Sequence, residues 1–326
     1  MFIRYVKISN FRGIKECEWR CNSRMVCLIG AGDSTKTTLL DAIGLCLCRS
    51  YDPKFSDSDF FMLDTTNSIE IIVGVSEIPE SMSTFKTFGT DLSAIGADGT
   101  LKEQRESEDD VDLLLVRLAV TAELEPKWEI ISPSDADERR RDIGVGARRD
   151  LGYRRLGEQI DQHLRWSRGS ALSDSPEIRD SSQGLMTQAH RVARESVYDA
   201  IPDELKRVAE SVGSRSRELG SNLAENVRPG LDPNAVGTGN ALILHSEMTP
   251  LSGFGLGTRR LTAIAAQEAM AVEGSILSID EIESGLEPHR VVRALRYLES
   301  LTKGKQTQVF FTTHSPTVVA SVSVGQ

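Results

Sequence analysis

Short apolar segments, separated by glycine, proline and polar residues, occupy both ends of the chain and predict an α/β fold. Near the N-terminus the apolar positions alternate or form short runs, which is typical of strands. A helical apolar pattern follows the third of these runs. The predicted strands span 2–9, 15–19, 25–29, 68–76, 111–121 and 127–132, and the predicted helix spans 37–48.

The middle of the chain, 135–231, has a helical pattern that is poor in β-branched residues. The pattern predicts helices over 151–166, 183–200 and 203–225, the last of which begins at Pro202-Asp203-Glu204, a sequence suited to a helix N-terminus. Because this segment separates two strand-rich ends, we expect a helical insertion that projects as an arm or a dimerisation module. The predicted domain division is 1–134, 135–231 and 232–326.

Two polar stretches add to this picture. Residues 79–110 end in an acidic cluster and are predicted to form a solvated, mobile loop. An arginine-rich stretch in the insertion has acidic neighbours and few aromatic residues, which favours a solvated face or a protein interface over DNA binding. Its arginines are Arg139, Arg140, Arg141, Arg148, Arg149, Arg154 and Arg155.

The composition is typical of a soluble globular protein, and the N-terminal sequence leads us to expect a cytoplasmic one. Of 326 residues, 39% are apolar and 26% are charged, and no run of about 18 apolar residues suits a membrane span. The N-terminus alternates like a strand and lacks the apolar core of a signal peptide. The five cysteines lack the spacing of a zinc site and are expected to be reduced. The net charge of −10 argues against a nucleic-acid-coated protein but leaves a local basic surface open.

The clearest candidate chemistry lies where strand 25–29 meets the following helix. The chain reads G-A-G-D-S-T-K-T there, close to the phosphate-binding pattern G-x-x-x-x-G-K-[ST]. Backbone N–H groups of such a loop bind phosphates, the lysine reaches the terminal phosphates, and the last hydroxyl holds Mg²⁺. Thr35 stands at the second glycine of the pattern. The predicted nucleotide-binding residues are Gly30, Gly32, Asp33, Ser34, Thr35, Lys36, Thr37 and Thr38.

A second glycine turn follows the insertion. The segment PLSGFGLGTRRL, residues 250–261, places a Ser-Gly-x-Gly turn directly before a helix. Such a turn predicts a second anion site. Because the turn has no lysine, it suits a phosphate that another subunit already holds.

Two short strands then end in polar residues. SILSIDEIESGLEPHR, residues 275–290, contains a predicted apolar strand, 276–279, that ends in Asp280-Glu281. One such carboxylate can hold Mg²⁺ and the next can polarise the water that attacks a γ-phosphate. QVFFTTHSP, residues 308–316, places His314 just beyond another buried strand, as a candidate γ-phosphate sensor.

NFRGI near the start, the P-loop, SGFG, the DE-containing block and TTHSP, in this order, resemble the ABC-type ATPase head of the RecF/SMC/OLD (overcoming-lysogenisation-defect) group. The likeness covers about 1–75 and 240–320, and GLEPHR followed by THSP is more similar to the OLD-type branch than to transporter ATPases. It implies a head with a mixed sheet, an antiparallel β-layer and a helical insertion. Such a head binds ATP and Mg²⁺ and dimerises with nucleotide between the P-loop and the signature turn.

The resemblance also implies roles for single residues. Thr37 and Asp280 would hold the metal, Lys36 would bind phosphate, Glu281 would be the base and His314 the switch. Residues that would act across the dimer or on phosphate are Ser252, Gly253, Gly255 and Arg12. The loop between 50 and 65 lacks the glutamine that usually reads the metal, and the candidate substitutes are Asp57 and Asp59.

Several functions stay open at this point. The leading one is an ATPase that regulates a nuclease effector, in defence against phage or in DNA repair. Related OLD-type proteins carry a Toprim nuclease after the head, which we do not find here, so the chain is either shortened or works with an effector on a separate polypeptide. The alternatives are a RecF/SMC-like head that clamps DNA without cutting it and a nucleotide-sensing scaffold with little hydrolysis, which Thr35 leaves open. The expected partners are a second copy of the chain or a higher oligomer, the effector and DNA, but no membrane.

Overall fold

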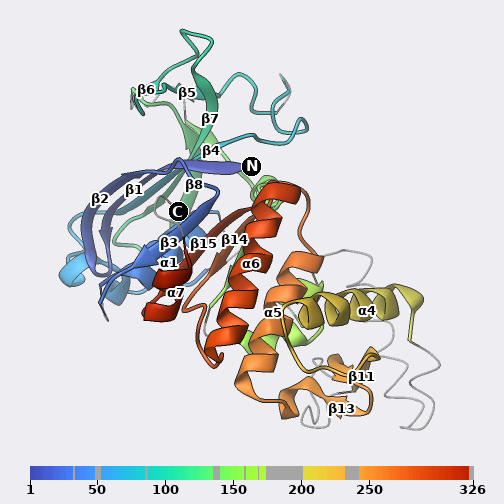
Figure 1. The fold of residues 1–326 in the computed structure, drawn as a ribbon. Helices are drawn as coiled ribbons and strands as arrows, with labels where there is room; N and C mark the ends of the chain where they lie inside the picture. Colours follow the sequence, from blue (N-terminus) through green and yellow to red (C-terminus); the bar gives the residue numbers. More distant parts are fainter. Residues whose placement is uncertain are drawn as a thin grey trace.

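The computed structural model describes residues 1–31, 34–47, 53–84, 87–134, 140–157, 159–167, 169–173, 201–231 and 242–322. An antiparallel β-layer lies beside a parallel sheet, and long helices cover the far side of the parallel sheet (Figure 1). This arrangement confirms the predicted α/β fold with its antiparallel layer. Among the described residues, no helix combines the length and the apolar character that crossing a membrane requires.

The antiparallel layer has the strand order β2-β1-β4-β7-β5-β6, with β8 paired to β7 and β9 paired to β8. The segment 79–110, predicted as a loop, contributes two of these strands, because β5 pairs with both β6 and β7. Part of that prediction is therefore wrong. The strands are β1 (Phe2–Phe11), β2 (Ile14–Arg20), β4 (Ile69–Ser76), β5 (Ser93–Ile95), β6 (Leu101–Lys102), β7 (Val111–Val120), β8 (Pro126–Ile131) and β9 (Arg141–Asp142).

The parallel sheet has the strand order β10-β14-β15-β3. Its members come from four distant parts of the chain: β3 (Met25–Ile29), β10 (Tyr153–Leu156), β14 (Ile276–Ile279) and β15 (Gln308–Thr313). Because all pairs are parallel, the carboxyl ends of the strands meet at one edge. That edge is where ligands bind in open α/β sheets.

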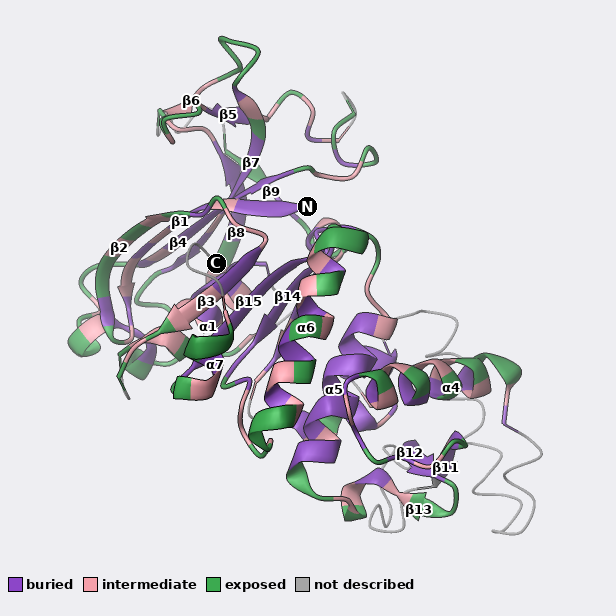
Figure 2. Ribbon diagram, in the orientation of Figure 1, coloured by how far each residue is buried: buried purple, intermediate pink, exposed green. Residues whose placement is uncertain are grey.

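Helices cover the parallel sheet on both faces. Phe310 of β15 belongs to the apolar cluster that holds α1, whereas its neighbour Phe311 belongs to the cluster that holds α5 and α6. The two central strands, β14 and β15, are accordingly buried along their whole length (Figure 2), as is usual for parallel sheets, whereas the edge strand β3 ends in the exposed Ile29. The main helices are α1 (Lys36–Cys46), α2 (Val145–Asp150), α4 (Asp203–Glu218), α5 (Leu256–Ala269), α6 (Pro288–Gly304) and α7 (Pro316–Ser321).

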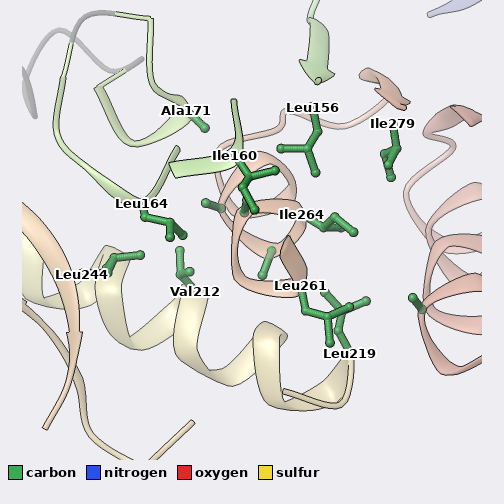
Figure 3. Close-up of a cluster of buried hydrophobic side chains, with 14 of the residues drawn as sticks. Leu156, Ile160, Leu164, Ala171, Val212, Leu219, Leu244, Leu261, Ile264 and Ile279 are labelled. Atoms are coloured by element: carbon green, nitrogen blue, oxygen red, sulfur yellow. The ribbon is translucent and has the colours of Figure 1, made fainter. Parts of the chain in front are cut away.

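The second apolar cluster extends from the parallel sheet to α4 (Figure 3). Leu261 and Ile264 of α5 lie at its centre, between Leu156 and Ile279 of the sheet and Val212 of α4. The remaining elements are η1 (Asp57–Asp59), η2 (Phe61–Leu63), η4 (Ile160–Leu164), η5 (Ala171–Ser173), β11 (Val227–Leu231), β12 (Leu242–Ser246), β13 (Thr249–Pro250) and η6 (Leu251–Gly253).

One buried amide joins the two sheets. Gln308, at the start of β15, accepts a hydrogen bond from the backbone N–H of Ile3 at 2.7 Å. Its Nε2 donates to the carbonyls of Ile3 and Ser23, each at 3.1 Å. The side chain thus ties the first strand of the antiparallel layer to the parallel sheet.

The predicted helix over 151–166 is wrong. Tyr153–Leu156 forms strand β10, which pairs with β14, and Ile160–Leu164 forms a short 3-10 helix. The predicted helix over 203–225 ends earlier, at Glu218, where Gly220 has a φ of 99° that a right-handed helix cannot adopt. The predicted helix over 183–200 lies outside the described residues.

The arginine-rich stretch is less solvated than its sequence suggests. Arg148 and Arg154 are buried, at 2% and 7% exposure. The Arg148 guanidinium lies 3.9 Å from the centre of the Trp128 ring, and Arg154 donates to the carbonyl of Met270. The boundaries at 134 and 231 stay predictions, although β10 places part of 135–231 inside the parallel sheet.

Candidate active site

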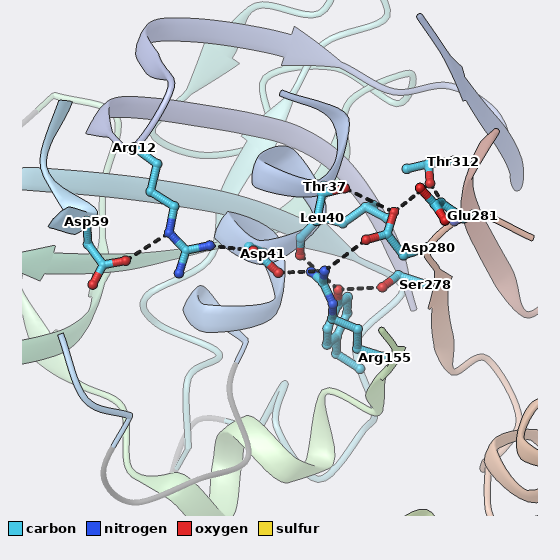
Figure 4. A network of polar contacts seen from close by, with 11 residues as sticks. Arg12, Thr37, Leu40, Asp41, Asp59, Arg155, Ser278, Asp280, Glu281 and Thr312 are labelled. Atoms are coloured by element: carbon cyan, nitrogen blue, oxygen red, sulfur yellow. Dashed lines mark hydrogen bonds and ion pairs between the residues drawn. The ribbon is translucent and has the colours of Figure 1, made fainter. Parts of the chain in front are cut away.

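The P-loop and the carboxylate that follows β14 meet at the carboxyl edge of the parallel sheet. Thr37, in the first turn of α1, places its Oγ1 3.2 Å from Oδ1 of Asp280. Thr312, near the end of β15, donates its hydroxyl to the same Oδ1 at 2.6 Å. Figure 4 shows these side chains converging from three elements.

Lys36 lies over its own loop. Its Nζ donates to the carbonyls of Gly30 at 3.0 Å and Ala31 at 2.7 Å, and to Oγ of Ser34 at 3.0 Å. All of these acceptors are neutral, so a phosphate in the loop would offer the ammonium stronger, charge-assisted partners. Thr38 is half-buried in the same turn of α1, whereas Gly32 and Asp33 lie outside the described residues.

Thr35 has the backbone conformation for which the pattern reserves a glycine. Its φ of 62° and ψ of 11° are left-handed, which costs an ordinary residue about 1–2 kcal/mol. The space for its methyl group comes from Gly13: a Cβ at that position would lie 2.8 Å from Cγ2 of Thr35. A glycine in the turn between β1 and β2 therefore accommodates the departure from the P-loop pattern.

The residues present fit a magnesium ion. Thr37 offers a hydroxyl and Asp280 a carboxylate, and Mg²⁺ prefers oxygen ligands of this kind together with phosphate oxygens and water. Asp280 is 5% exposed, so a cation or hydrogen-bond donors must stabilise its negative charge in place of water. The contact between the two groups puts both donors on one side of a single small site.

Glu281 and His314 lie at the same edge, and both are exposed. Glu281 directly follows Asp280 with a left-handed φ of 46°, and its backbone N–H donates to Oγ1 of Thr312 at 2.7 Å. The backbone N–H of His314 donates to Oε1 of Glu283 at 2.6 Å. The structure thus brings the two predicted catalytic residues to the edge that holds Thr37, and their roles stay predictions.

Arg12 is held by carboxylates. Its guanidinium donates to Oδ2 of Asp41 at 2.5 Å and to Oδ1 of Asp59 at 2.8 Å, and it lies over the Phe11 ring. Asp59, one of the two candidate substitutes for the missing glutamine, is therefore a partner of Arg12, whereas Asp57 is exposed.

The signature turn lies apart from the P-loop. Ser252 and Gly253 are in η6, and Gly255 precedes α5. A Cβ at Gly255 would meet nothing within 4 Å, and one at Gly253 would meet only Cγ2 of Thr249, at 3.9 Å. In Figure 1 the turn lies near β13, on the α5 side of the sheet and away from α1.

Three charged residues of the site escaped sequence reasoning. Asp41 lies one turn after Thr37 on α1, a spacing that could have pointed to it. Arg155 of β10 contacts Asp41, and nothing in the surrounding sequence distinguishes it. Arg260 of α5 is 4% exposed and donates to the backbone carbonyl of Asp280; burial lowers the pKa of its guanidinium, and Glu281 is the first of the nearby carboxylates that oppose this.

A pocket of about 570 Å³ adjoins the P-loop. It opens between the P-loop residues Ser34–Lys36, the strand β2 from Ile14 to Cys17, and the end of β3. Cys27 lines it, and burial raises the pKa of that thiol to about 11, so the group is a neutral thiol. The pocket gives a molecule bound at the P-loop room to extend toward β2.

Comparison with known proteins identifies the family. Residues 25–320 match the family described as AAA domain, putative AbiEii toxin, Type IV TA system. A crystal structure of an Smc head bound to the C-winged helix domain of ScpA superposes with a TM-score of 0.59 at 14% identity, covering 99% of this chain and 92% of that one. The Smc head with an extended coiled coil, bound to the C-terminal domain of ScpA from Pyrococcus furiosus, gives 0.57 at 14% identity and covers 98% and 92%.

The comparison with curated proteins gives no match. The solved structures are too distant in sequence to show more than a shared fold, which is that of the SMC head. The family match spans the P-loop, the signature turn, Asp280-Glu281 and His314. The chain belongs to this family of AAA domains and has the fold of an ABC-type P-loop ATPase head.

Proposed function

We propose that this chain is the ATP-binding and ATP-hydrolysing head of an OLD-like protein that dimerises around nucleotide and regulates a nuclease effector. The observation that carries the ATPase proposal is the 3.2 Å contact between the Thr37 hydroxyl and the Asp280 carboxylate. It joins the two oxygen donors that a metal-nucleotide site needs, and Thr37 directly follows Lys36 in the first turn of α1.

Nucleotide binding follows from the loop and the pocket beside it. The phosphates lie on backbone N–H groups between β3 and α1, where the helix N-terminus also favours negative charge. Lys36 exchanges its neutral loop acceptors for phosphate oxygens. The nucleoside then extends into the pocket lined by β2, which lies directly beside the loop.

Hydrolysis requires a positioned water and compensation of charge. Thr37 and Asp280 would hold Mg²⁺, which would compensate the negative charge of the phosphates. Glu281 accepts a proton from the attacking water, and Thr312 fixes its backbone through the bond to its N–H. His314, at the end of the neighbouring strand, contacts the γ-phosphate.

Dimerisation is proposed from the open signature turn. Ser252, Gly253 and Gly255 stand before α5 without a lysine and with free space around the glycines. A phosphate bound by a second head would complete this site. The regulation of a nuclease effector and a role in defence against phage or in DNA repair both rest on the resemblance to the OLD-type branch.

The test of the ATPase proposal is the variant Lys36→Ala. Loss of the charge-assisted phosphate contact costs about 1.5–3 kcal/mol, so the affinity for a fluorescent ATP analogue in a Mg²⁺ titration should fall by at least tenfold. Lys303→Ala is the matched control, because Lys303 is exposed in α6 and pairs only with Glu299 among the described residues. Equal affinity in the Lys36→Ala variant and the control would refute the P-loop assignment.

A further inference from the structure

Five charged side chains form a row that leads from the N-terminal turn to the metal-site carboxylate. Asp59 binds Arg12, Arg12 binds Asp41, and Asp41 binds Arg155, with Oδ1 of Asp41 2.5 Å from Nη2 of Arg155. The same Nη2 lies 3.7 Å from Oδ2 of Asp280. Figure 4 shows Arg155 between the two carboxylates.

The backbone fixes this geometry. Arg155 pairs with Ser278 in the β10–β14 register, and the N–H of Asp280 donates to the carbonyl of Leu156 at 3.0 Å. Asp41 lies one turn beyond Thr37, so both face the same site from α1. Arg155 is therefore held beside Asp280 by strand pairing, and its Nη1 is buried without a hydrogen-bond partner in the described part of the chain.

The Asp280 carboxylate has few other partners. Its Oδ1 accepts from Thr37 and Thr312, and both donors are neutral hydroxyls. Arg260 donates to the backbone carbonyl of Asp280. Within the described residues, Arg155 is thus the cation at ion-pair distance from this carboxylate.

The Arg155 guanidinium beside Asp280 lowers the affinity of this carboxylate for a metal ion, because like charges repel. Arg155 compensates the negative charges of Asp41 and Asp280, which otherwise repel each other across the site. A divalent metal at Asp280 would do the same, and it would be repelled by the guanidinium. Metal binding therefore gains most when a triphosphate brings additional negative charge to the P-loop.

We propose that Arg155 is a positioning residue that sets the metal affinity of Asp280 and makes metal binding depend on nucleotide. The proposal rests on the proposed ATPase function. In the nucleotide-free head, Arg155 is the cation that compensates the charge of Asp280. Its ion pair with Asp41 limits how closely the guanidinium approaches the Asp280 carboxylate. The guanidinium keeps the empty site from retaining metal.

The experiment measures Mn²⁺ binding to the nucleotide-free chain, from the electron paramagnetic resonance signal of free Mn²⁺. Arg155→Gln should bind Mn²⁺ at least about tenfold more tightly than the wild type, because a like charge a few ångströms from the metal is removed. Arg155→Lys keeps the charge and should bind close to the wild type. Arg141→Gln removes the same charge at an ion pair with Asp91 far from the site, and it should leave the affinity unchanged.

A second variant should change the Mn²⁺ affinity in the opposite direction. Asp41→Asn removes the anchor of Arg155 and leaves the guanidinium to Asp280, so Mn²⁺ affinity should fall about tenfold. Melting temperatures show whether each variant is folded. If Arg155→Gln does not fold, Arg155→Met, which removes the same charge, takes its place, and unchanged or weaker Mn²⁺ binding in that variant overturns the proposal.

The outcomes separate this proposal from the proposed function. Unchanged or weaker Mn²⁺ binding by folded Arg155→Gln overturns the role of Arg155, even when the wild type binds a non-hydrolysable ATP analogue with Mn²⁺. A wild type that binds no analogue under any metal condition refutes the ATPase proposal instead. Tighter binding in Arg155→Gln together with weaker binding in Asp41→Asn supports the inference.

Discussion

The P-loop and the signature turn both place glycines before a helix, yet their surroundings differ. In the P-loop, Lys36 contacts its own loop, and the methyl group of Thr35 packs against Gly13, which has no side chain. In the signature turn, Gly253 and Gly255 are exposed, and a Cβ at either position would meet almost nothing. One turn is supported by its own chain on several sides, and the other presents an open surface.

This difference indicates that the P-loop binds nucleotide and that the signature turn serves head association. The P-loop has a cation, a neighbouring pocket and a carboxylate within one chain, so we expect it to bind nucleotide in a single copy. The signature turn has no cation, so we expect it to contribute only when a second head supplies the phosphate. Nucleotide affinity should depend on the first turn alone, and head association on both.

The largest expected effect comes from Glu281→Gln. The change keeps the size of the side chain but removes its basicity, so the rate of ATP hydrolysis should fall by about two to four decades. ATP should still bind through Lys36 and Thr37, and the uncleaved nucleotide should hold two heads together. Light scattering should then show an ATP-dependent rise in mass. Wild-type hydrolysis in this variant would contradict the role of Glu281 as the base. A distance between heads that does not change with ATP would contradict the nucleotide site shared by two heads.

Ser252→Arg tests the role of the signature turn in head association. The long side chain should fill the space that the partner's phosphate needs and weaken head association by about 1–3 kcal/mol, so the mass increase should be lost in Glu281→Gln, Ser252→Arg. The affinity of the single head for ATP should stay at the wild-type value. A drop in that affinity would show that the turns do not act separately. If the insertion keeps the chain dimeric, distances between labels on the two heads replace mass as the readout.

Gly13→Ala tests the support behind the P-loop. The added Cβ would lie 2.8 Å from Cγ2 of Thr35, so the free energy of unfolding should fall by about 1–3 kcal/mol in chemical denaturation. The loss should largely vanish when Thr35→Gly is added. Gly255→Ala is the control from the open turn, with a φ of −59° and nothing near its Cβ, and should change stability by less than about 0.5 kcal/mol.

The smallest effect is expected from Thr35→Gly alone. Relief of the left-handed strain is worth about 1–2 kcal/mol, and the greater freedom of glycine in the unfolded chain opposes it by about 0.4–1 kcal/mol. Stability should therefore rise slightly, and ATP affinity or turnover should increase because the phosphate loop is less crowded. No change in either would remove the main support for a head that hydrolyses slowly.

Uniform apolar runs made much of the fold predictable. The strands at 25–29 and 276–279 have the bounds that their sequence indicates. Strand β10 was missed because its two central residues are arginines, which the tertiary structure buries or half-buries against Met270 and Asp41. No local pattern reports partners that lie more than a hundred residues away.

The candidate site divides in the same way. The P-loop, Asp280-Glu281 and His314 were predictable because each is a short motif at a strand end, and the structure places them at one edge. Arg155 and Arg260 act on that edge from β10 and α5, and each was indistinguishable by sequence from an arginine on a solvated surface. Their roles depend on strand pairing and helix packing, which arise only in the folded chain.

The order of the parallel sheet also constrains how the chain folds during synthesis. The P-loop strand β3 pairs with β15, so its neighbour is made long after β3 has left the ribosome. Contacts between such distant segments slow folding, because the loop between them must be closed before the contact stabilises anything. Until residues 308–313 exist, Gln308 cannot join the sheets and Asp280 has no Thr312 beside it. We therefore expect a nascent chain to be unable to form the nucleotide site before residues 308–313 pair with β3, so ATP binding should begin only after that step.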